Sequence, residues 1–132
     1  MNWARRNVCL WMLGLSACGG GDGTVKLPAA FGGQWRLAGS AAETDVPEVA
    51  KQLGLKAAMR GRYEGDNGEL TVRIFRMAAQ ASAFELIQKW RAEPGTLHFQ
   101  SEDLFVVLEK SGATTATLDT WARQFDEQLR KR

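Results

Sequence analysis

The sequence is poor in the residues that build metal centres and reactive sites. Its 132 residues include two cysteines, Cys9 and Cys18, and a single histidine, His98. His98 has no serine or cysteine partner at a spacing typical of nucleophilic enzymes, so we interpret it as a surface or strand histidine. No other pattern indicates a catalytic group, and we expect a protein without enzymatic activity.

Long apolar runs are also missing. The run near the N-terminus, residues 8–15, is far shorter than the roughly 20 residues that cross a bilayer as a helix. It follows Arg5 and Arg6 and leads into small residues, which is the three-part layout of a secretory signal. Residues 15–18 read Leu-Ser-Ala-Cys and resemble the lipobox of bacterial lipoproteins.

This resemblance implies a lipoprotein signal peptide over residues 1–17 and a lipid attached to Cys18. Two acyl chains hold a protein stably on a membrane, whereas one chain binds only marginally. The resemblance therefore implies a protein anchored in the cell envelope. Gly19 would direct it to the periplasmic face of an outer membrane if the host has one. Arg5 and Arg6 leave the twin-arginine export route open.

Loss of the signal would change the composition of the working protein. Cys9 would leave with the signal and Cys18 would be acylated, so no thiol would remain for a disulfide or for a zinc site of Cys/His type. The formal net charge of +2 comes from Arg5 and Arg6, so basic and acidic side chains balance in the rest of the chain. Such a chain has no basic field that would recruit nucleic acid. We expect neither a metal, a cofactor nor a nucleic-acid partner.

The rest of the chain divides into a short lead and one domain. Residues 18–33 predict a flexible, glycine-rich tether that continues into an extended lead-in, and residues 34–132 predict a single domain. Strands are expected at 34–38, 97–101 and 104–110, and on either side of a hairpin turn at Asn67–Gly68. Helices are expected at 46–53, 79–91 and 116–130.

This order indicates an α+β fold. Hairpins joined by amphipathic helices predict a mainly antiparallel sheet of about five strands, with the helices packed chiefly on one face. The apolar run 104–108 indicates a central strand or one that is covered on both faces. Asp45 and Glu48 would form the capping box of the first helix. Ala83, Ile87 and Trp90 would form the buried stripe of the second helix, widened by Phe84.

The last helix has the clearest apolar face. Its expected core residues are Leu118, Trp121, Ala122, Phe125 and Leu129. Trp35, Trp90 and Trp121 could line a ligand pocket, but their positions favour core anchors. Glu102 and Asp103 could hold a cation, although adjacent acids between two strands are typical of a solvated turn.

An arginine cluster is the most testable candidate site. A turn at Asn67–Gly68 would place Arg62 opposite Arg73, on the face that also carries Arg60 and Phe75. Like charges in such positions repel, so Glu64, Glu109, solvent or an anionic ligand should compensate them. Arginine suits bidentate capture of a carboxylate or phosphate. The alternative is an ordinary solvated sheet face with local ion pairs.

Several short segments resemble one group of proteins. They are Leu27-Pro28, Gly33-Gln34-Trp35, the strand that ends at Met77, and the following helix with Ala83-Phe84. The pattern is similar to that of an uncharacterised family of bacterial envelope lipoproteins that is classed as a domain of unknown function. That family implies no activity.

Two functions remain open. The first is a lipid-anchored, non-enzymatic interaction or assembly domain that binds another envelope protein. The second is a carrier of a small apolar or anionic ligand, which requires a pocket of roughly 300–1,000 Å³.

Overall fold

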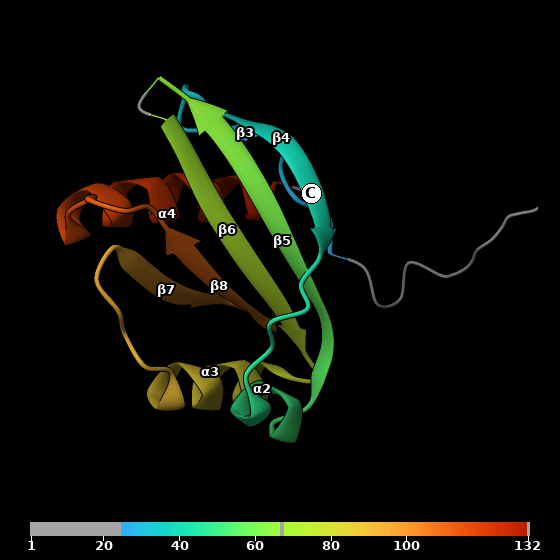
Figure 1. The fold of residues 1–132 in the computed structure, drawn as a ribbon. Coiled ribbons are helices and arrows are strands. Elements are labelled where there is room, and N and C mark those ends of the chain that lie inside the picture. Colours follow the sequence, from blue (N-terminus) through green and yellow to red (C-terminus); the bar gives the residue numbers. More distant parts are fainter. Residues whose placement is uncertain (1–24, 67, 132) are drawn as a thin grey trace, which may run out of the picture.

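The computed structural model describes residues 25–66 and 68–131 as one α+β domain around a curved antiparallel sheet (Figure 1). The sheet consists of β3 (Ala30–Phe31), β4 (Trp35–Ala42), β5 (Leu55–Gly65), β6 (Gly68–Met77), β7 (Thr96–Ser101) and β8 (Leu104–Glu109). The helices are α2 (Glu48–Gln52), α3 (Gln80–Lys89) and α4 (Thr115–Arg130). Cys18 lies outside the described residues, as does the rest of the expected signal and tether up to residue 24.

The six strands lie in the order β3-β4-β5-β6-β8-β7, and every neighbouring pair is antiparallel. The predicted α+β class is therefore confirmed, while the expected count of five strands is low by one. The additional strand is β3, whose two residues pair with Trp35 and Arg36. So short a strand leaves no period-2 pattern in the sequence.

The prediction that the helices pack chiefly on one face is wrong. Val106 and Leu108 of β8 point into a cluster with α4, whereas Phe105 and Val107 point into a second cluster with α2 and α3. Successive side chains of a strand alternate between faces, so the two clusters lie on opposite faces. The apolar run of β8 is explained by this double cover, and β8 lies between β6 and β7 as expected of an inner strand.

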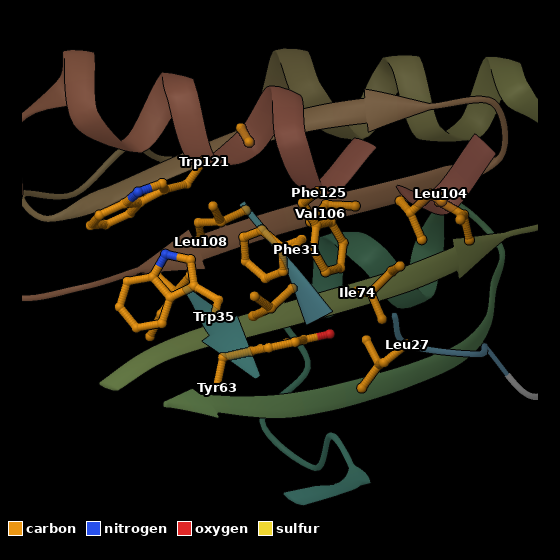
Figure 2. Packing of buried hydrophobic residues seen from close by; sticks show 14 of the residues in the cluster. Leu27, Phe31, Trp35, Tyr63, Ile74, Leu104, Val106, Leu108, Trp121 and Phe125 are labelled. Atoms are coloured by element: carbon orange, nitrogen blue, oxygen red, sulfur yellow. The ribbon is translucent and has the colours of Figure 1, made fainter. Parts of the chain in front are cut away.

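The larger cluster fills the space between the sheet and α4 (Figure 2). Phe125 of α4 meets Phe31 edge-on at 5.1 Å between ring centroids and Tyr63 at 6.1 Å. Trp35 and Trp121 meet edge-on at 5.0 Å. All five predicted core residues of the last helix are buried. Val25, Leu27 and Phe31, from the expected lead-in, are buried in the same cluster.

The hairpin of β5 and β6 has a register different from the expected one. The ladder runs on to Gly65 opposite Gly68, so the pair between the strand ends is Asp66 and Asn67 rather than Asn67 and Gly68. Tyr63 consequently pairs with Leu70. The shift moves each partner by two residues, which keeps every side chain on its predicted face.

Two helix details also differ. The capping box is wrong, because α2 begins one residue after Pro47 and no side chain caps it. The stripe of α3 is centred on Ala83 and Leu86, and Phe84 is 55% exposed rather than part of the core. Gly54 ends the α2 turn with a φ of 99°, a backbone conformation that favours glycine.

Candidate functional site

The arginine cluster is organised by a glutamate that the sequence patterns did not single out. Arg60, not Arg62, lies opposite Arg73 in the β5–β6 ladder. Between the two guanidinium groups lies Glu43, just after the end of β4. Its Oε1 accepts a hydrogen bond from Arg60 Nε at 2.9 Å and another from Arg73 Nε at 3.0 Å. The repulsion expected from paired arginines is thus offset by a carboxylate of the chain itself.

Arg73 is held on all three nitrogens. Besides the bond to Glu43, its Nη1 donates to Glu109 Oε2 at 3.2 Å and its Nη2 donates to the backbone carbonyl of Asp45 at 2.7 Å. Its side chain is only 10% exposed, and the guanidinium lies 5.4 Å from the Phe75 ring and 5.7 Å from the Trp90 ring. A buried charge fixed in this way has a defined plane and direction.

Glu43 is the most buried acid of this network, with a side chain that is 2% exposed. Burial by itself would raise its pKa. The backbone N–H of Asp45, at 2.9 Å from Oε2, and the charges and hydrogen bonds of Arg60 and Arg73 outweigh burial, so the pKa lies below its ordinary value of 4.5. Glu43 therefore remains a carboxylate at neutral pH.

Arg62 belongs to a different group. It pairs with Glu64 at 2.7 Å and with Glu69 at 3.3 Å, and all three side chains are about half exposed. Phe75 is fully buried beneath Arg73 and Trp90, so it offers no exposed aromatic wall. Of the four predicted residues, the structure brings together Arg60, Arg73 and Phe75 and leaves Arg62 in a solvated ion-pair group. Glu64 pairs with Arg62 and Glu109 with Arg73, but the opposed Arg62–Arg73 pair that these acids were expected to compensate does not form.

An open pocket of about 320 Å³ lies beside Arg73. Its floor comes from the sheet, with Arg73, Val107 and Glu109. Lys89, Trp90 and Arg91, at the end of α3, form one wall. Asp45, Pro47 and Val49, at the start of α2, also line it.

A second groove, of about 340 Å³, runs along the outer strand β7 beside α4. It is lined by Leu97 and Phe99 of β7 and by Asp119, Ala122 and Asp126 of α4, among others. Asp126 pairs with Arg130 through Oδ2 at 3.2 Å, whereas its buried Oδ1 has no hydrogen-bond partner.

The other side chains considered as possible site residues lie in the core, in a strand or in a turn. Trp35 and Trp121 are core residues, and Trp90 packs on Phe105 at 4.8 Å between centroids. His98 lies in β7 near Phe105, and burial lowers its pKa. Glu102 and Asp103 form the turn between β7 and β8, and Glu102 has a φ of 57°.

The described part of the chain was found to hold neither a cluster of potential metal ligands nor a helix that could span a membrane. No group of three or more potential metal-ligating side chains occurs within residues 25–66 and 68–131. Among the described helices, none combines the length and the apolar character that a bilayer crossing requires. The expected Cys18 anchor lies outside these residues.

Sequence reasoning missed Glu43 because its only local signal is its place after a strand. We expected that strand to end at Ala38, whereas β4 continues to Ala42. A β-bulge between Leu37 and Gly39 interrupts the alternation that would have revealed its full length.

Comparison with known proteins gives no relative. No protein-family model, no curated protein and no solved structure matches the chain.

Proposed function

We propose that this protein is a lipid-anchored, non-enzymatic envelope protein that binds an extended segment of a partner protein along strand β7. The observation that carries the proposal is the unprotected edge of the sheet at β7. The lipobox-like pattern that ends at Cys18 supports the anchor, as does the resemblance to uncharacterised envelope lipoproteins.

The two edges of the sheet differ in how readily another strand could pair with them. At one edge, β3 has only two residues and β4 carries a bulge between Leu37 and Gly39. Short edge strands and bulges are devices that prevent pairing with other chains. At the other edge, β7 runs for six residues in unbroken register and contains neither a charged residue nor a proline. It lacks the usual protection.

The hydrogen-bonding groups of β7 are placed for an added strand. Lys110 donates its N–H to the Gly95 carbonyl at 2.8 Å, which sets the alternation of the ladder with β8. Every second residue from Gly95 then directs its backbone N–H and C=O groups toward β8. Thr96, His98 and Gln100 lie between these residues, so their backbone groups point away from β8, toward the open edge of the sheet. The Thr96 N–H is used by the Glu93 carbonyl at 3.2 Å, which leaves the outward groups of His98 and Gln100 for a partner.

The groove beside β7 indicates the chemistry of that partner. Leu97, Phe99 and Ala122 offer apolar contact to alternate side chains of an added strand. We therefore expect an extended segment with apolar residues at every second position. Main-chain bonds supply affinity in this mode and the alternate side chains supply specificity.

The packing favours this function over an apolar carrier. Trp35, Trp121 and Phe125 fill the space between α4 and the sheet with edge-on aromatic contacts. The pockets described above lie at the surface, not within this core.

The test uses the lipidated protein, extracted gently from its native envelope, and compares His98→Pro with His98→Ala. Both variants lose the imidazole, but only proline removes the outward N–H; the β8 ladder does not use that group. We expect the wild type and His98→Ala to show the native mass of a complex with another envelope protein, and His98→Pro to show the monomer mass.

Two results would overturn the proposal of strand pairing. One is a complex that His98→Pro retains, and the other is a protein that is only monomeric or only self-associated in all three forms. Circular dichroism would verify that His98→Pro is folded. The mass of the first residue tests the anchor separately, since a chain that does not begin with an acylated Cys18 would refute the anchor alone.

A further inference from the structure

The pocket beside Arg73 is a second feature, independent of β7, and its charges are unusual. Three basic side chains line it, Arg73, Lys89 and Arg91, together with three acidic ones, Asp45, Glu93 and Glu109. A site for a simple anion or cation would carry an excess of one sign. This pocket is balanced, which favours a ligand that carries both charges.

Arg73 retains donors for such a ligand. A guanidinium has five N–H groups, and three are used by Glu43, Glu109 and the Asp45 carbonyl. One N–H on each terminal nitrogen remains, and Arg73 forms part of the pocket floor. The three bonds and the Phe75 and Trp90 rings fix the guanidinium before any ligand arrives. Preorganisation of this kind lowers the entropic cost of binding.

The two signs come from different parts of the pocket wall. Lys89 and Arg91 lie at the end of α3 and just after it, and neither forms an ion pair within the described residues. Asp45 lies on the segment before α2, and Glu109 lies on the sheet. Val49 and Val107 add apolar surface between these charges.

We infer that this pocket binds a small zwitterion of the amino-acid class. Its carboxylate is bound by Lys89, Arg91 and the free N–H groups of Arg73, and its ammonium group by Asp45 and Glu109. The apolar part of the ligand contacts Val49, Val107 and the edge of Trp90. The volume of about 320 Å³ lies at the small end of the range of ligand pockets, roughly 300–1,000 Å³, which suits a ligand of this size.

The test compares three probes that share the leucine side chain and are nearly equal in shape. L-leucine carries both charges, 4-methylpentanoate carries only the carboxylate, and leucinamide carries only the ammonium group. Each is titrated into the full protein in lipid nanodiscs, and the Trp90 indole N–H signal and the heat of binding are recorded. We expect leucine to bind at least about tenfold more tightly than either derivative, since each derivative leaves one set of charges unpaired.

Variants of Lys89 and Arg91, in the pocket wall at the end of α3, test whether leucine binds at this site. A Lys89→Gln/Arg91→Gln double variant should bind leucine about tenfold more weakly. Lys56→Gln, an exposed lysine on β5 outside the residues that line the pocket, should bind as the wild type does. The rim side chains are exposed, so the double variant should fold normally; replacing Arg73 is avoided because it would disturb the network around Glu43.

The inference is wrong if leucine does not shift the Trp90 signal, or if either 4-methylpentanoate or leucinamide binds as tightly as leucine. It is also wrong if the double variant and Lys56→Gln bind leucine equally well. These outcomes do not depend on the His98→Pro test, because β7 contributes only Thr96 to this pocket.

Discussion

The two faces of the sheet are covered in different ways. One face lies under α4, a helix of 16 residues, whose buried residues contact the sheet through apolar and aromatic side chains. The other lies under α2 and α3, of 5 and 10 residues, which cover only part of it. Where these helices end, the sheet carries Arg60, Arg62 and Arg73 with their acids.

The difference shows where stability and binding can reside. A face that one long amphipathic helix covers can be built from apolar side chains alone, and its stability comes from their burial. A face that short helices cover in part must satisfy its charges locally, as Glu43 does for two arginines. The small-molecule pocket that we propose lies at the boundary between the apolar and the charged parts of this second face.

The largest expected effect is on the α4 face. Phe125 is fully buried and contacts both Phe31 and Tyr63, so Phe125→Ala removes a large side chain from the centre of the core. We expect it to lower the free energy of unfolding by about 3–5 kcal/mol. Denaturant unfolding followed by circular dichroism measures this value. A loss below about 1 kcal/mol, as for a surface substitution, would show that α4 is not packed as described.

The second effect is on the face under α2 and α3, called the charged face below because it carries the arginines and their acids. Glu43→Gln keeps the shape of the side chain but removes the negative charge that Arg60 and Arg73 share. We expect a loss of about 2–3 kcal/mol, because Arg73 is left buried without its shared carboxylate. The same unfolding measurement applies, with Glu127→Gln as the control, since Glu127 is exposed on α4. Equal stability of the two variants would contradict the central place of Glu43.

The third prediction concerns acid. Because the pKa of Glu43 is lowered in the folded protein, its contribution to stability is complete above its ordinary value of 4.5 and is lost as the pH falls through the folded value. Stability measured from pH 6 downward should therefore fall less steeply in Glu43→Gln than in the wild type. Glu127→Gln should follow the wild type. Parallel curves for all three proteins would show that Glu43 titrates normally.

The same contrast explains which parts of the fold could be predicted from sequence. The apolar stripe of α4 was predicted residue by residue, because apolar residues at every three to four positions of a long helix mark its buried side. Strands β7 and β8 were also found within a residue of their ends. In these regions the local periodicity of apolar residues was sufficient to predict the secondary structure and the buried side chains.

The second face was predicted less well because its organisation is not local. Glu43 reaches Arg60 and Arg73 across 17 and 30 residues, and no spacing pattern encodes such contacts. The register of the hairpin depended on which pair of residues forms its turn, and this decided which arginine lies opposite Arg73. The apolar run 104–108 indicated that both faces of β8 are covered. Which helix covers which face follows only from the three-dimensional arrangement of the helices.

The smallest effects separate the two kinds of arginine on the charged face. Arg60 donates to the buried Glu43, whereas Arg62 donates only to exposed acids in solvent. We expect Arg60→Ala to lower the free energy of unfolding by about 0.5–1 kcal/mol, a value reduced by the 45% exposure of its side chain. Arg62→Ala should leave unfolding unchanged within error. Thermal unfolding of the two variants side by side measures the difference. If Arg62→Ala were the more damaging, the charged face would be organised around the end of the hairpin rather than around Glu43.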